Sequence, residues 1–167
     1  MRKIVLISTG GTIEKTYDEL SGILSNEVSV LDIMLARMDL RGVEIERLAL
    51  MSKDSLQMTT ADHALIAATA NRAAQTHDGV IVVHGTDTLA VTGETILALR
   101  NPPEAPIVIT GAMRPYALRN TDSMQNLVEA LLAVQLCAPG VYVAMHNQVL
   151  AFPGVTKDRD LGTFVKE

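Results

Sequence analysis

Short runs of β-branched and apolar residues recur along the chain, and longer stretches with helical spacing of apolar residues separate them. The predicted strands are Ile4–Ser8, Val43–Leu48, Gly79–Val83, Pro106–Ile109 and Gly140–Met145. The predicted helices are Val28–Met38, Ala61–Thr76, Ala90–Leu99 and Thr121–Cys137. Strands that alternate with helices predict an α/β fold with a mostly parallel sheet. Because the strand runs are almost continuous in Val and Ile, we expect helices on both faces of the sheet.

The remaining segments indicate how these elements begin and end. Thr60 precedes one helical stretch and residues 120–122 (Asn-Thr-Asp) precede another, and both positions predict polar helix caps. The last run, NQVLAFPGVTKDRDLGTFVKE, predicts a short strand followed by irregular chain. A chain of 167 residues suffices for one domain with a real core and is short for two. We therefore expect a single domain over residues 1–167.

Composition and charge exclude several classes of protein. The chain is 48% hydrophobic and 20% charged, which is typical of a globular protein. Its net charge is −5 and its Lys and Arg residues do not cluster, which disfavours nucleic acid as a partner. A single cysteine, Cys137, excludes an internal disulfide and a cysteine-based zinc site. No apolar run reaches membrane-spanning length, and the start MRKIVLIST is too short for a secretion signal, so we expect no membrane partner and a cytoplasmic location.

Three predicted strands end in a glycine beside a small or hydroxyl residue, in the segments STGGTI, HGTDT and GAMRP. In an open parallel sheet the carboxyl ends of the strands line a common crevice, where ligands bind. Glycine lets the backbone approach a ligand closely. One such segment is ordinary turn chemistry, but three in one small sheet favour a pocket. None of them is a G-x-G-x-x-G or P-loop pattern, so a nucleotide site is weakly supported.

The chemistry available at these strand ends is that of hydroxyl groups, one acid and a distant lysine. The chain holds no Gly-x-Ser-x-Gly elbow and no pair of histidines at metal-binding spacing. A threonine hydroxyl becomes a nucleophile when a base takes its proton, and a neutral lysine can do so. Asp87 and Lys157 would then complete a candidate acyl-transfer site. His84 is interpreted as a satisfied turn histidine, and the other histidines as isolated residues without a function, namely His63, His77 and His146.

Structural explanations of the same residues stay open at this point. Asp54 and Ser55 could form an ordinary turn. Asp87 could cap the helix that follows it. Lys157 could be a solvated residue of the final segment.

Four motifs, STGGTI, HGTDT, GAMRP and GVTK, occur in this order over essentially the whole chain. With them the sequence resembles the N-terminal domain of the bacterial-type L-asparaginases, which use a threonine nucleophile. The resemblance implies a doubly wound, flavodoxin-like three-layer sandwich. It also implies hydrolysis of L-asparagine to L-aspartate and ammonia through an acyl-threonine intermediate, with no metal and no organic cofactor.

The resemblance assigns catalytic roles to individual residues. Thr12 matches the nucleophile, and Thr86 matches an activator or second nucleophile. Asp87 and Lys157 match the other members of a threonine–lysine–aspartate proton relay. Tyr17 matches a tyrosine that activates the nucleophile from a mobile lid, which would span residues 10–25.

The resemblance also assigns substrate contacts. Ser55 would hold the α-carboxylate of the substrate, and Asp87 would meet its ammonium group. Asp54, next to Ser55, would also belong to the substrate-binding residues. The backbone N–H of Ala112 and the Thr86 region would stabilise the oxyanion. Gly11 would lie against the substrate beside the nucleophile.

One departure from the family pattern is large. Family members continue into a smaller C-terminal domain, and we expect that domain to be absent here, together with the carboxylate that a partner's C-terminal domain lends to the substrate. We expect a homodimer or a dimer of dimers. Two alternatives remain: an amidase for glutamine or a larger amide carrier, and a catalytically idle amino-acid-binding module.

Overall fold

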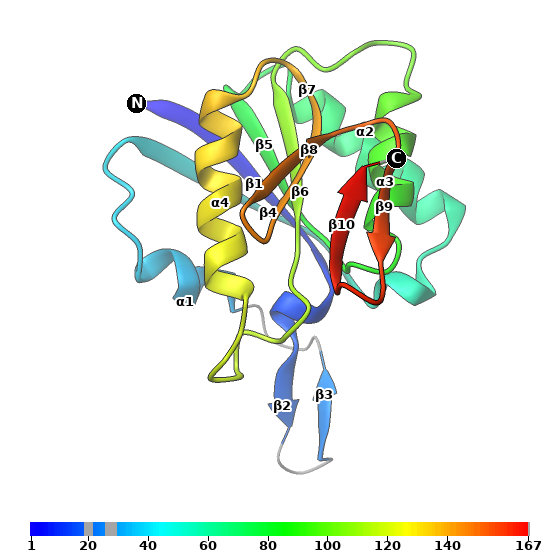
Figure 1. Cartoon of the computed structure of the whole chain (residues 1–167). Coiled ribbons are helices and arrows are strands. Elements are labelled where there is room, and N and C mark those ends of the chain that lie inside the picture. The colour runs from blue at the N-terminus through cyan, green and yellow to red at the C-terminus, as the bar shows by residue number, and fades with distance from the viewer. Residues whose placement is uncertain (19–21, 26–29, 167) are drawn as a thin grey trace.

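The structure, a computed structural model, describes residues 1–18, 22–25 and 30–166. Its centre is a six-stranded sheet in the order β4-β1-β5-β6-β7-β8 (Figure 1). The first five of these strands are parallel, and β8 pairs antiparallel with β7 at one edge. The strands are β1 (Arg2–Gly10), β4 (Val43–Lys53), β5 (Gly79–Val83), β6 (Pro106–Thr110), β7 (Gly140–Met145) and β8 (Gln148–Ala151).

Four helices cover the two faces of this sheet, namely α1 (Leu31–Ala36), α2 (Thr60–Ala73), α3 (Leu89–Leu97) and α4 (Ser123–Leu136). Val5 and Ile7 of β1 belong to the core formed with α2 and α3. Ile4 and Leu6 of the same strand belong to the core formed with α1 and α4. Successive strand residues thus point to opposite faces, and both faces are buried, which explains the continuous Val and Ile runs. The predicted doubly wound three-layer α/β fold is confirmed.

Two small antiparallel sheets complete the fold. One joins β2 (Thr16–Asp18) to β3 (Ile23–Ser25), within the predicted lid, whose residues 19–21 lie outside the described residues. The other joins β9 (Val155–Asp158) to β10 (Thr163–Lys166) beside α3 (Figure 1). The prediction of irregular chain after β8 is therefore wrong. Val155 and Phe164 are buried in the α2–α3 core, and this burial holds the short hairpin in place.

Several predicted boundaries differ from the structure in ways that affect the site. β4 continues five residues beyond its predicted end, and its last residue, Lys53, pairs with Gly10 of β1. The N-cap of α2 is Thr59 rather than Thr60, because Thr59 and Asp62 form a reciprocal capping box. The helix predicted from residue 28 begins, as α1, at Leu31; residues 28 and 29 lie outside the described residues. In the described part of the chain, no helix combines the length and the apolarity needed to span a membrane.

Candidate active site

The end of β1 lies directly against the end of β5. Gly11 has φ +87°, in the left-handed region that favours glycine. A Cβ atom on Gly11 would lie 2.5 Å from the Gly85 amide nitrogen, so this close approach requires glycine. The Gly11 N–H donates to the carbonyl of Lys53, which also ties the end of β4 to this turn. Thr12 follows at once, partly exposed, and begins a short 3-10 helix, η1 (Thr12–Glu14).

The turn between β5 and α3 presents Thr86 and Asp87 to Lys157. The Lys157 ammonium on β9 donates to Thr86 Oγ1 at 2.8 Å and to Asp87 Oδ1 at 2.9 Å. The Lys157 and Asp87 side chains are only 16% and 25% exposed, which excludes Lys157 as a solvated residue. Arg159 makes a second, longer contact of 3.3 Å with Asp87 Oδ1. Asp87 does not cap α3, because the N-cap position belongs to Thr88.

Asp54 and Ser55 lie where β4 ends, in a 3-10 helix rather than a simple turn, η2 (Ser55–Gln57). Asp54 caps this helix by accepting a hydrogen bond from the Leu56 N–H. Ser55 is buried against the β5 turn, since a Cβ atom on Gly85 would lie 2.6 Å from Ser55 Oγ. The Thr88 hydroxyl donates to the Ser55 carbonyl at 2.9 Å. The ends of β4 and β5 are therefore joined by side-chain contacts.

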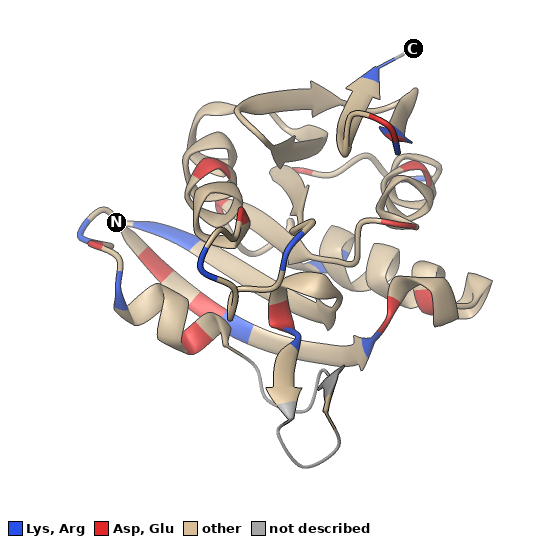
Figure 2. Ribbon diagram, turned by 60° about the horizontal axis from the view of Figure 1, so that its bottom comes forward, with Lys and Arg blue, Asp and Glu red and all other residues tan. Residues whose placement is uncertain are grey.

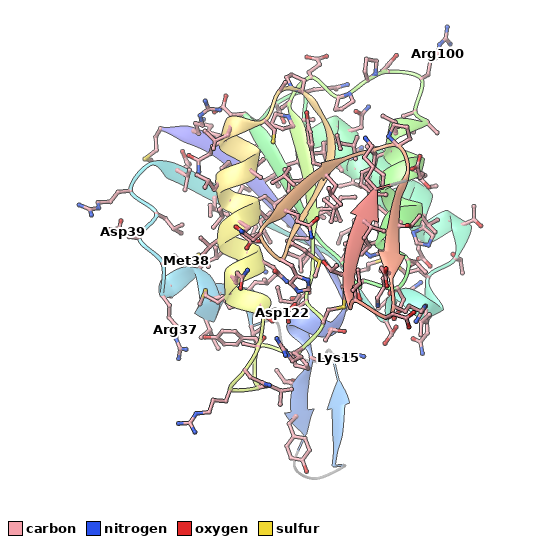
Figure 3. All side chains as sticks on the ribbon, viewed as in Figure 1. Lys15, Arg37, Met38, Asp39, Arg100 and Asp122 are labelled. Atoms are coloured by element: carbon pink, nitrogen blue, oxygen red, sulfur yellow. The ribbon has the colours of Figure 1, made fainter. Side chains whose placement is uncertain are left out.

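An ion pair connects this region to the start of the β2–β3 hairpin. Lys15 Nζ lies 2.9 Å from Asp54 Oδ2. Figure 3 shows Lys15 where the hairpin leaves the body of the molecule. The hydrogen bond from Lys15, together with that from the Leu56 N–H, holds the pKa of Asp54 below its ordinary value.

The end of β6 brings Gly111 close to Thr86, and Ala112 is the next residue. A Cβ atom on Gly111 would lie 3.3 Å from Thr86 Cγ2, and the Gly111 carbonyl accepts a hydrogen bond from Asn126 Nδ2 of α4. Ala112 is fully buried. The structure thus brings together, at the carboxyl ends of four strands, the residues that the sequence predicted apart from Tyr17: Gly11, Thr12, Asp54, Ser55, Thr86, Asp87, Ala112 and, from β9, Lys157.

Tyr17 is the exception among the predicted site residues. It lies on β2, in the hairpin that extends away from the central sheet (Figure 1), and it is 62% exposed. Among the described residues no hydrogen bond joins its hydroxyl to Thr12. Its role as the lid tyrosine stays a prediction.

Sequence reasoning missed a buried polar cluster behind the β6 turn. The Asp122 carboxylate, at the start of α4 (Figure 3), accepts hydrogen bonds from the N–H groups of Met113 and Arg114. His146 Nε2 lies 2.7 Å from Asp122 Oδ2, and its Nδ1 lies 3.0 Å from Thr163 Oγ1 of β10. Although burial opposes the charged form, these hydrogen bonds hold the pKa of Asp122 below its ordinary value. The interpretation of His146 as an isolated residue is therefore wrong.

A cavity of about 500 Å³ lies beside Lys157, lined by Met113, Arg114, His146, Lys157, Arg159, Leu161 and Gly162. Elsewhere Lys and Arg are interspersed with Asp and Glu along the ribbon (Figure 2). Within the described ranges, no group of three or more His, Cys, Asp or Glu side chains could hold a metal ion. The chemistry that the site offers is that of threonine hydroxyls, a lysine and a carboxylate near backbone N–H groups.

The chain matches a known protein family. A family model described as "Asparaginase, N-terminal" matches residues 3–161. The chain belongs to the asparaginase family. It is 33% identical over 165 residues to the L-asparaginase of Thermococcus kodakarensis, covering 96% of this chain and 49% of that protein. The solved structure of that thermostable enzyme superposes with a TM-score of 0.86 over 98% of this chain and 51% of the other.

Other relatives of this chain are described either as L-asparaginases or as amidotransferase polypeptides. The structure of a probable cytoplasmic L-asparaginase from Campylobacter jejuni is 28% identical, with a TM-score of 0.82 over 99% of this chain and 53% of the other. A glutamyl-tRNA(Gln) amidotransferase polypeptide from Haloquadratum walsbyi is 34% identical over 147 residues, covering 86% of this chain and 33% of that protein. The chain thus spans about half the length of the L-asparaginases that it matches. The family predicted from the four motifs is confirmed.

Proposed function

We propose that this chain is an amidohydrolase that converts L-asparagine to L-aspartate and ammonia through an acyl-threonine intermediate. The observation that carries the proposal is the pair of hydrogen bonds from Lys157 Nζ, one to Thr86 Oγ1 and one to Asp87 Oδ1. A threonine, a lysine and a carboxylate in direct contact can pass a proton between them. Thr12 directly follows Gly11, and Gly11 closely approaches Gly85, the residue before Thr86, which supports a shared site.

In the proposed reaction, Thr12 Oγ1 attacks the side-chain amide carbon of the substrate and loses its proton to the relay. The C–N bond breaks, the nitrogen takes up a proton, and ammonia leaves. Water then attacks the acyl-threonine ester, which releases aspartate and returns the proton to Thr12. Thr86 serves as activator or second nucleophile within the same relay.

The neighbouring groups suit the charged ends of an amino acid. The buried Ser55 hydroxyl and the adjacent η2 helix would hold the α-carboxylate, and the partly buried Asp87 would attract the ammonium group. The Ala112 N–H would stabilise the oxyanion. Gly11, next to Thr12, would lie against the substrate.

A second candidate is an amidase that acts on glutamine or on a larger amide carrier. The relatives described as glutamyl-tRNA(Gln) amidotransferase polypeptides favour it, because one of them is 34% identical to this chain over the matched residues, against 33% for the L-asparaginase. One methylene in a pocket is worth only about 1–3 kcal/mol, so asparagine and glutamine differ little for such a site.

The test is ammonia release from the purified protein with L-asparagine, with L-glutamine and with glutaminyl-tRNA(Gln) as separate substrates. We expect the highest kcat/KM with L-asparagine. A higher kcat/KM with either of the other substrates would replace the asparaginase proposal with the second candidate. Binding of amino acids without ammonia release from any substrate would indicate an idle binding module.

We further propose that the protein forms a homodimer or a dimer of dimers in the cytoplasm. Val128, Leu132 and Leu136 are exposed along α4. Val128 and Leu132 line a groove of about 530 Å³ together with Met38 and Leu40. Apolar surface of this kind favours association, and a twofold dimer is its simplest closed form. The likeness to a probable cytoplasmic L-asparaginase supports the compartment.

A further inference from the structure

Two histidines and a threonine form a buried chain of hydrogen bonds behind the turn that carries Thr86. His84 follows β5, Thr92 lies on α3 and His63 lies on α2, and all three are at most 5% exposed. Thr92 Oγ1 lies 2.8 Å from His84 Nε2 and 2.7 Å from His63 Nδ1. His84 Nδ1 lies 2.8 Å from the Gly85 carbonyl oxygen. We refer to His63, Thr92 and His84 as the His–Thr–His chain.

The direction of each hydrogen bond in the His–Thr–His chain follows from its members. A carbonyl oxygen only accepts, so His84 Nδ1 carries the proton that bonds Gly85. Burial lowers the pKa of His84 to about 4, so near neutral pH its ring is uncharged and Nε2 is an acceptor. The Thr92 hydroxyl gives its only proton to this Nε2 and therefore accepts the hydrogen bond from His63 Nδ1–H. The protons of these three hydrogen bonds are therefore assigned to His84 Nδ1, Thr92 Oγ1 and His63 Nδ1.

Thr92 differs in this respect from its neighbour Thr95 on the same helix. The Thr95 hydroxyl donates to the Val91 carbonyl four residues back, which is a common local bond of helical threonines. The Thr92 hydroxyl instead bridges two imidazole rings, that of His63 on α2 and that of His84, which follows β5. These rings are also stacked, with centroids 6.0 Å apart and planes at 17°. The His–Thr–His chain therefore links two helices to the backbone of the active-site turn.

The Gly85 carbonyl, where the His–Thr–His chain ends, belongs to the peptide that leads into Thr86. Gly85 has no side chain to fix its conformation, and the turn is enclosed by Gly11 and Ser55. A hydrogen bond at the Gly85 oxygen sets the plane of the Gly85–Thr86 peptide. It also polarises that peptide and strengthens the Thr86 N–H as a donor.

We propose that the His–Thr–His chain positions Thr86 by holding the Gly85–Thr86 peptide, so that the Thr86 hydroxyl faces Lys157 and the Thr86 N–H faces the substrate. The kinetic part of this proposal rests on the proposed amidase function. The three residues act through Thr86 and do not contact the substrate.

The kinetic test compares three variants on α3. Thr92→Val keeps the side-chain volume and removes both hydrogen bonds, Thr92→Ser restores the hydroxyl, and Thr95→Val is the matched control. We expect Thr92→Val to lower kcat about 10- to 100-fold, because small misplacements of a catalytic group cost this much. We expect KM to change less than about threefold, since substrate contacts stay in place. Thr92→Ser should recover most of kcat, and Thr95→Val should retain it.

A second test is spectroscopic, needs no activity, and begins with the wild-type protein. The ring nitrogens of His84 in the wild-type protein, observed by ¹⁵N NMR near neutral pH, should show a protonated Nδ1 and an unprotonated Nε2. The Thr86 amide proton shift should then change in Thr92→Val and stay constant in Thr95→Val.

Two NMR outcomes would overturn the positioning role: a protonated Nε2 on His84, or an unchanged Thr86 amide in Thr92→Val. Two kinetic outcomes would also overturn it: equal kcat values for Thr92→Val and Thr95→Val, or equal kcat values for Thr92→Ser and Thr92→Val. If the wild-type protein hydrolyses no amide, the proposed function fails. The ring tautomer and the Thr86 amide still decide the positioning role in that case.

Discussion

Lys157 contacts both side chains that the β5–α3 turn presents, and the proposed chemistry depends on it more than on any other residue of β9. In the structure Lys157 Nζ donates to Thr86 and Asp87. An ammonium group has no lone pair, so it cannot accept a proton from Thr86. The proposed relay therefore includes the loss of a proton from Lys157 before the attack on the substrate.

Replacement of Lys157 by methionine should remove this step while keeping the length of the side chain. We expect kcat for ammonia release to fall at least about 1000-fold, as it does when a nucleophile loses its activating partner. Lys166→Met is the matched control, because Lys166 lies on β10 and its ammonium bonds only the Ala151 carbonyl among the described residues. A Lys157→Met protein that kept more than about a tenth of the wild-type kcat would not fit the relay.

His84 should make the stability of the fold depend on pH. Its pKa of about 4 in the folded protein lies below the ordinary value of 6.5, because burial disfavours the charged ring. Between these two values the unfolded chain binds the extra proton, so the free energy of unfolding rises with pH and falls on acidification from about 6.5 to 4. The full effect is about 3 kcal/mol.

Urea denaturation at several pH values measures this effect. His84→Gln has no ring to titrate, so its stability should change less than that of the wild-type protein across this window. We therefore expect the stability difference between the two proteins to shrink as the pH falls. Parallel stability curves for both proteins from pH 6.5 to pH 4 would count against a neutral buried His84.

Individual residues differ in how far the sequence could predict them. Thr12 and Thr86 follow glycine turns at predicted strand ends, and the parallel sheet places such ends side by side. Lys157 is 70 residues from Asp87, so the sequence alone left open whether it was a site residue or a solvated one, and the family resemblance assigned it to the relay. The bonds of His63 and His146 depend on the packing of separate helices and turns, and no spacing in the sequence encodes them.

The β2–β3 hairpin is the element most directly connected to the substrate region. Lys15, at its start, pairs with Asp54, at the end of β4. This pair joins the expected lid to the short η2 helix beside Ser55. Opening of the hairpin would therefore affect the residues that are expected to hold the α-carboxylate.

Asp54→Asn should loosen this connection without removing the helix cap, because asparagine can still accept from the Leu56 N–H. We expect faster amide hydrogen exchange over residues 12–17. The loss of stability should stay below about 1 kcal/mol, since the pair is partly exposed. Lys53→Met, which breaks the Lys53–Asp62 pair away from the hairpin, is the control. Equal exchange rates over residues 12–17 in Asp54→Asn and wild-type protein would show that the pair does not restrain the hairpin.

Most elements follow from patterns that the sequence displays. The strands β1, β5 and β6 are buried on both faces, and their β-branched runs are visible. The edge strand β4 has only exposed and half-buried residues. β9 and β10 lack such a signal because they are four residues long and contain charged residues between their few buried positions. They pair mainly with each other, and only Val155 and Phe164 anchor them to the core.

For the whole molecule, the exposed apolar face of α4 suggests an interface between copies of this chain. We expect multi-angle light scattering to give a dimer or tetramer for the wild-type protein. Leu132 and Leu65 are 58% and 49% exposed, on α4 and α2 respectively. Leu132→Glu should shift the protein toward the monomer, because it places a charge in the proposed interface. Leu65→Glu should leave the assembly unchanged.

Two results would contradict this assembly. One is a wild-type monomer at all concentrations studied. The other is an equal effect of the two glutamate substitutions, which would show that α4 is no more involved in association than α2.

The β9–β10 hairpin also has a consequence for the time at which activity can arise during synthesis. Thr86 and Asp87 leave the ribosome some 70 residues before their partner Lys157. Until β10 emerges and Phe164 enters the core, the nascent chain holds a nearly complete sheet whose threonines have no lysine beside them. If the proposed relay operates, the growing polypeptide would therefore be chemically silent while its central sheet is being made, and the site would become competent only once this hairpin has formed.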